Sequence, residues 1–362
     1  MTTSGRDATA RAPSDPRARW RGVDAARGLA VLGMMAAHTW PRDGSQAELL
    51  VDGRPSVLFA VVAGVAMGLV TGGDTPSAHA RGAMRARFVI RAAILIALGL
   101  LLWMLPSGIA IILDYYGVMF LLLVPLLFAP RWVLAAVAAT LLIVAPLVRD
   151  GVVELTGAEP AGPLVGDFGA ILLDYLFTGY YPALLWLPLL LVGLWCARAG
   201  LASTRVRLLM LGLGAAASVA GYSAAAVLPG VDVTAHSGST AELLGAGGLA
   251  VAIIAAALLA FDGTSPRRVV QFIAAPLTAL GRVAFTVYVA HVVIIAGLAP
   301  LGPAGQFDAA VGIPLLIALS LSGIALGLIC QASGRRAPLE WLLSAVTSRA
   351  FRDTGPGARL GR

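Results

Sequence analysis

The first apolar stretch of the chain, VDAARGLAVLGMMAAHTW at residues 23–40, carries three ionisable side chains: Asp24, Arg27 and His38. An α-helix has about 3.6 residues per turn, so Arg27 and His38 share one face about 16 Å apart, and Asp24 lies on the same side. Imidazole titrates near neutral pH and suits general-base chemistry. Ionisable groups within a span usually face a cavity. The stretch therefore predicts a polar path; a local Asp24–Arg27 ion pair and an interfacial histidine are the alternatives.

A second histidine pattern lies late in the chain, in the apolar segment 272–299. His291 follows Tyr288 by three residues and shares its helix face, while Arg282 lies nearer the other end. We expect His291 to reach the depth of His38 in the membrane. It could orient His38, bind an acceptor or act as the base, or it could be a structural histidine bonded between helices.

Further polar residues are expected on the same side of the membrane as His38. A carboxylate on this side could orient His38, as the aspartate does in a catalytic triad. Those of Asp43 and Glu48 are close enough to His38 in sequence to do so. For His236, the alternative is a position in a solvated loop without a role in binding. The candidates for binding an acceptor are Asp52, Arg54, Asp114 and His236.

Composition indicates what positions these residues. The chain is 59% hydrophobic and 12% charged, about half the charged fraction of a soluble protein. Apolar runs of about 20 residues recur, and each is long enough to cross a bilayer as a helix. We predict an all-α, polytopic transmembrane helix bundle of about ten spans. They are residues 23–40, 55–72, 88–105, 111–129, 131–148, 179–198, 206–228, 241–261, 272–299 and 310–331.

Arginine placement predicts the orientation. With the N-terminus inside, 21 of the 26 basic residues, all of them arginine, fall in cytoplasmic segments and three fall outside. This bias favours an even number of spans, with both termini on the cytoplasmic side. The membrane is expected to be the cell membrane (the inner or plasma membrane). The expected domains are a disordered cytoplasmic N-terminus (1–20), the membrane domain (21–333) and a basic tail (334–362), in which residues 338–351 form an amphipathic helix on the membrane surface. Residues 149–178 are expected to form the longest loop.

Several function classes are disfavoured. The net charge of +7 comes from arginines in short loops, so we expect no nucleic-acid binding. Cys196 and Cys330 have no ligand spacing, and we expect neither a disulfide nor a metal site. The arginines of residues 81–91 could hold phosphates or simply set orientation. Gly64 and Gly68, four residues apart, predict close helix packing.

Four segments in order along the chain carry a family resemblance: RWRGVDAARG (19–28) with His38 after it, DGRPSVLFAVVAGVAMGL (52–69), LGRVAFTVYVAH (280–291) and GRRAPLEWL (334–342). They resemble the superfamily of integral-membrane acyltransferases, in particular bacterial proteins related to heparan-α-glucosaminide N-acetyltransferase. In that enzyme the catalytic histidine lies in the loop after the first span. Here the histidine of this region is His38, at the end of the span, so its role as general base or as covalent acyl carrier stays open.

The resemblance implies transfer of an acyl group, often acetyl, from cytoplasmic acyl-CoA to an extracytoplasmic sugar, glycolipid or cell-envelope polymer, by O- or N-acylation. It implies His38 and His291 as catalytic candidates, with Asp24, Arg27 and Arg282 on the donor side. Membrane lipid and a lipid-linked or glycan acceptor are the expected partners, and a homodimer is left open. The alternatives are a transporter or flippase that binds substrate or relays protons through the same residues, and a non-catalytic sensor or scaffold. Neither inverted repeats nor two halves with matching broken spans are evident, which disfavours a transporter.

Overall fold

The computed structural model describes residues 20–42, 51–76, 80–157, 162–262 and 268–349. Every regular element in these ranges is helical, as the sequence predicts. The helices are α1 (Arg21–Thr39), α3 (Arg54–Val70), α4 (Arg81–Trp103), α5 (Leu113–Leu123), α6 (Arg131–Thr156), α7 (Phe168–Leu173), α8 (Ala183–Arg198), α9 (Thr204–Val227), α10 (Thr240–Phe261), α11 (Arg268–Arg282), α12 (Ala284–Gly297), α13 (Ala309–Ala332) and α14 (Pro338–Arg349). Short turns of 3-10 helix, η1 (Val124–Leu126) and η3 (Ala299–Leu301), and of π-helix, η2 (Asp174–Thr178), complete the set.

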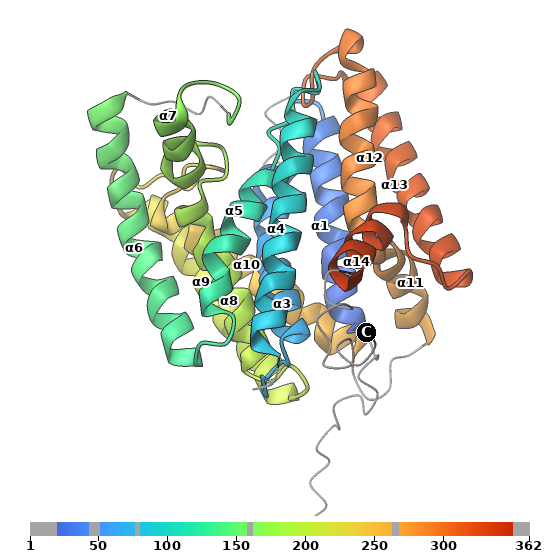
Figure 1. The fold of residues 1–362 in the computed structure, drawn as a ribbon, viewed down its shortest axis with the longest axis horizontal. Helices are drawn as coiled ribbons and strands as arrows, with labels where there is room; N and C mark the ends of the chain where they lie inside the picture. The colour runs from blue at the N-terminus through green and yellow to red at the C-terminus, as the bar shows by residue number, and fades with distance from the viewer. Residues whose placement is uncertain (1–19, 43–50, 77–79, 158–161, 263–267, 350–362) are drawn as a thin grey trace, which may run out of the picture.

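The helices form one bundle with α6 at one edge and α13 at the other (Figure 1). Five helices are long and apolar enough to cross a membrane, or up to seven if each of two bent pairs counts as one span. This indicates a membrane protein. Each of the ten predicted segments contains a helix, but the count of ten spans, their orientation and the membrane concerned remain predictions.

Two predicted boundaries are wrong. Much of the expected loop at residues 149–178 is helical, because α6 continues to Thr156 and α7 and η2 follow. The expected continuous span at 272–299 is broken: the helices on either side of Val283 meet at 78°. A second pair, Phe168–Thr178 and Ala183–Arg198, is bent by 44°. Only the first of these bends interrupts a predicted span, because the second joins the predicted span 179–198 to the segment that was expected to be a loop.

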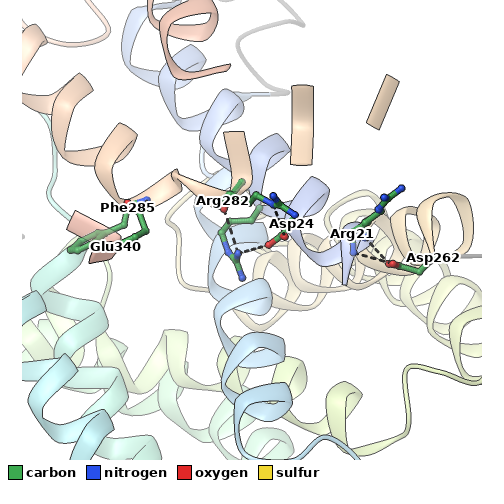
Figure 2. A network of polar contacts seen from close by, with 9 residues as sticks. Arg21, Asp24, Asp262, Arg282, Phe285 and Glu340 are labelled. Carbon is green, nitrogen blue, oxygen red and sulfur yellow. Dashed lines mark hydrogen bonds and ion pairs between the residues drawn. The ribbon is translucent and has the colours of Figure 1, made fainter. Parts of the chain in front are cut away.

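The break at Val283 is capped by a residue far along the chain. In a continuous helix the N–H groups of Phe285 and Thr286 would bond to carbonyls four residues earlier. Here both donate to the carboxylate of Glu340 on α14, at 2.9 and 3.2 Å. Figure 2 shows Glu340 beside the start of α12. The segment expected on the membrane surface is indeed a helix, and its carboxylate caps another helix.

Close backbone contacts hold α1 against α11. A Cβ atom at Gly281 would lie 1.8 Å from the carbonyl oxygen of Asp24, and one at Gly28 would lie 2.1 Å from that of Leu277. The two helices can meet only because both glycines lack side chains. The predicted packing role of Gly64 is of the same kind, since a Cβ there would lie 2.1 Å from a carbonyl oxygen of α8.

Charged side chains cap the ends of two helices. The carboxylate of Asp262, after α10, accepts the N–H groups of Arg21 and Gly22 and so caps the start of α1 (Figure 2). The buried guanidinium of Arg198 donates to the carbonyls of Gly68 and Leu127 and to other oxygens near the end of α3. A cation is stabilised there because the last carbonyls of a helix point toward it.

Candidate functional site

A cavity of about 310 Å³ lies toward the start of α1, and we call it the basic cavity. Three guanidinium groups line it, those of Arg27, Arg91 and Arg282, together with the carboxylate of Glu340. The rest of its wall is mostly apolar and includes Phe59, Met67, Phe88, Phe120 and Phe285. A site of this composition favours an anionic group joined to an apolar one.

One carboxylate contacts two of the three arginines of the basic cavity, Arg27 and Arg282. Asp24 is buried and accepts a hydrogen bond from Arg27 at 2.9 Å, while Arg282 Nε lies 3.8 Å from its second oxygen. Figure 2 shows Asp24 beside Arg282. Arg27 also donates to the carbonyl of Gly281, at 3.4 Å, next to the break between α11 and α12. The local ion pair considered from the sequence therefore forms, and Arg27 still faces the cavity.

A larger cavity of about 630 Å³ lies toward the end of α1, and we call it the histidine cavity. His38, Arg42, Asp52 and His236 line it, and aromatic side chains cover much of the remaining wall. Those aromatic residues are Trp103, Tyr180, Tyr181 and Tyr288. Ionisable groups and aromatic surfaces in one hollow are typical of binding sites for polar ligands.

The two cavities share part of their walls. Met34, Ile112 and Tyr288 line both of them. The hydroxyl of Tyr288 accepts the N–H of Ile112 at 3.3 Å, and as an acceptor it keeps its own hydrogen for another partner. A thin partition of three side chains thus separates the basic cavity from the histidine cavity.

His38 and His291 meet at the histidine cavity. Nδ1 of His38 lies 3.0 Å from Nε2 of His291, a hydrogen-bond distance. The ring planes differ by 8° and the ring centroids lie 5.2 Å apart. This is close to the largest centroid separation that two imidazoles can have when their nitrogens are 3.0 Å apart. The rings therefore meet edge to edge in nearly one plane. His38 is half-buried and lines the cavity, whereas His291 is 1% exposed.

The loop before α10 presents His236 to the same cavity in a left-handed conformation, with φ at 64°. Such a conformation is uncommon for a residue other than glycine and needs support from its surroundings. Glu242 provides it, since its carboxylate accepts the N–H groups of His236 and Gly238 at 3.0 and 2.8 Å. The imidazole lies against the rings of Tyr181 and Trp186. Burial lowers the pKa of His236, and the charge of Asp52 and a backbone hydrogen bond at Tyr180 oppose this.

Not every predicted site residue reaches a cavity. Within the described ranges Asp114 and Arg54 line neither of the two. Asp114 is fully buried and accepts from Trp103 Nε1 and the hydroxyl of Tyr175, at 3.1 and 3.0 Å. The guanidinium of Arg54 lies over the ring of Tyr222, 5.2 Å from its centroid. Their geometry favours structural roles. Asp43 and Glu48 lie outside the described residues.

Sequence reasoning missed two parts of the site. Met34 and Ile112 are ordinary apolar residues of apolar runs, and nothing in the pattern distinguishes them as the partition. Glu340 stands in the quoted closing segment GRRAPLEWL, so a signal was present there, but its role at α12 follows only from the folded chain.

Comparison with known proteins assigns no activity. No curated protein matches the chain. Residues 195–350 match the model of a family described as a protein of unknown function (DUF418). The match covers the part of the chain that contains His236, Tyr288, His291 and Glu340, and it begins after His38.

Proposed function

We propose that the protein transfers an acyl group, such as acetyl, from a coenzyme A thioester in the basic cavity to a hydroxyl or amine of an acceptor in the histidine cavity. With the orientation predicted from the arginines, the donor comes from the cytoplasm. The acceptor is then an extracytoplasmic sugar, glycolipid or cell-envelope polymer.

The observation that carries this proposal is the partition shared by two differently built cavities. Arg27 and Arg282 offer charge to phosphate groups on one side, and apolar side chains beside them suit a thin pantetheine arm. His38 lies on the other side, where a polar acceptor has room. A thioester that extends from the basic cavity past Met34 and Tyr288 would come within reach of both His38 and the acceptor.

The chemistry needs few groups. The acceptor oxygen or nitrogen bonds to the thioester carbon as His38 takes its proton, and the carbon–sulfur bond then breaks. The released thiolate recovers that proton from the imidazolium, so no metal or redox partner enters the balance. In this proposal the hydroxyl of Tyr288, which lines both cavities, donates to the developing oxyanion.

Thiol release tests the proposal directly. Purified full-length protein in nanodiscs is given acetyl-CoA, with or without crude cell-envelope glycans, and free coenzyme A is measured. We expect glycan-dependent release that His38→Gln lowers at least 100-fold, in line with loss of a general base. The matched control, His79→Gln, replaces a histidine outside the described residues and should retain activity. Release that is absent from the wild type, or unchanged in His38→Gln, would refute the proposal.

The donor side has its own test. Arg27→Gln removes a charge from the basic cavity and should raise the KM for acetyl-CoA about tenfold with a smaller effect on kcat. Arg205→Gln, at an exposed position on α9, is the matched control. Equal KM values for the two variants would exclude the basic cavity as the donor site.

A transporter is the second candidate, and the two bent helix pairs favour it. Broken helices that line the substrate site are typical of secondary transporters, and residues at both bends line a cavity here. Proteoliposomes loaded with a pH-sensitive dye and offered labelled envelope glycans distinguish the two functions. Glycan uptake or proton entry without thiol release would establish transport; thiol release without uptake would establish acyl transfer.

A further inference from the structure

We propose that His291 is a positioning residue that fixes the tautomer of His38, so that the bare Nε2 of His38 is the atom that faces the histidine cavity as a base. This role rests on the proposed acyl transfer. The tautomer itself rests only on the geometry of the two histidines and of the Val287 carbonyl.

The backbone carbonyl of Val287 fixes the tautomer of His291. Nδ1 of His291 lies 3.4 Å from the carbonyl oxygen of Val287, one turn earlier on α12. A carbonyl oxygen can only accept, so the hydrogen belongs to Nδ1 of His291. The opposite assignment would set a nitrogen lone pair against an oxygen lone pair.

The tautomer of His291 in turn determines that of His38. With its hydrogen on Nδ1, a neutral His291 has a bare Nε2, which can only accept. That atom lies 3.0 Å from Nδ1 of His38, so Nδ1 of His38 is the donor. Nε2 of His38 is consequently bare, and it lies on the side of the ring away from His291. The edge-to-edge arrangement of the rings suits one linear N–H···N bond.

Exposure separates the two histidines by role. His38 lines the histidine cavity, whereas His291 is buried and lines neither cavity within the described ranges. His291 therefore acts on the substrate only through His38. The pair resembles a catalytic triad in its logic, with a neutral imidazole and a backbone carbonyl where a triad has a carboxylate.

The pair also accounts for the proton during transfer. When Nε2 of His38 takes the acceptor proton, the hydrogen on its Nδ1 can shift to Nε2 of His291. His291 would then carry hydrogens on both nitrogens, one bonded to Val287 and the other to His38. The return of both hydrogens delivers the proton to the leaving thiolate and restores the starting tautomers, so the cycle closes without a third group.

Nitrogen NMR tests the tautomer without any assay of activity. Full-length protein labelled with 15N-histidine is studied in nanodiscs, and signals are assigned by their loss in His38→Gln and His291→Gln. We expect a neutral His38 with hydrogen on Nδ1 and coupling across the N–H···N bond to His291. In His291→Phe, which keeps a planar ring without an acceptor, the hydrogen of His38 should move to Nε2. A wild-type His38 protonated on Nε2, or one unaffected by His291→Phe, would overturn the assignment.

Kinetics then tests the positioning role. We expect His291→Phe to lower kcat about 100-fold, as loss of an orienting partner does, with the KM for acetyl-CoA within about twofold. His291→Gln supplies an amide oxygen that can accept from Nδ1 of His38, and it should recover at least tenfold of that loss. Gln as inactive as Phe, with both variants monodisperse, would refute positioning. If the wild type releases no coenzyme A while the NMR result holds, the proposed function fails and the tautomer assignment stands.

Discussion

Replacing Gly281 with alanine tests the contact that holds α1 against α11. The added Cβ would lie 1.8 Å from the carbonyl oxygen of Asp24, where ordinary contact begins at 3.4 Å, so the two backbones must separate by about 1.6 Å. The obstructing atom belongs to the backbone and cannot rotate away. Overpacking of this kind costs about 3 kcal/mol, and the better helix propensity of alanine returns about 1 kcal/mol. We therefore expect a net loss of about 2 kcal/mol.

The assay is thermal unfolding in detergent, followed by the fluorescence of the seven tryptophans. A loss of this size corresponds to a fall in Tm of about 3 °C for a protein of this length. Gly212→Ala on α9 is the matched control, because a Cβ there meets nothing within 4 Å in the described part of the chain. It should leave the Tm unchanged or raise it slightly. If the two variants melt together, close backbone contact does not hold α1 against α11.

Three further substitutions test the capping and burial arguments. Glu340→Gln weakens two charge-assisted bonds to the first amides of α12 by about 1 kcal/mol each, so hydrogen exchange of these amides should quicken about 30-fold. The exposed control Glu154→Gln should not change their exchange rate. Equal exchange rates in the two variants would disprove the cap. Arg198→Met removes the guanidinium that donates to the buried carbonyls of Gly68 and Leu127 and should destabilise the protein by about 2–4 kcal/mol in thermal unfolding. A loss no larger than that of exposed Arg205→Met would contradict this. Because burial lowers the pKa of His236 below its usual 6.5, the unfolded chain binds a proton there first as the pH falls, and stability declines below pH 6.5. His236→Gln should reduce the fall in Tm between pH 7.5 and pH 5, and identical pH profiles would rule out a buried neutral imidazole.

The sequence by itself determined the helical class and the local geometry within single helices. Runs of apolar residues long enough to span a bilayer can satisfy their backbone groups only as helices. The spacing of Asp24 and Arg27 placed them one turn apart on one face, and the ion pair forms there. These results depend on residues close in sequence, so the 3.6-residue period is sufficient to predict them.

Tertiary structure alone decided what these residues face. At the break at Val283, the carboxylate of Glu340, more than fifty residues away on another helix, accepts the hydrogens that a continuous helix would use. His38 and His291 lie 253 positions apart and meet at 3.0 Å, whereas Asp114 turned into the bundle interior. Contacts between helices depend on how side chains of several helices fit together, and no period in one stretch of sequence records that fit.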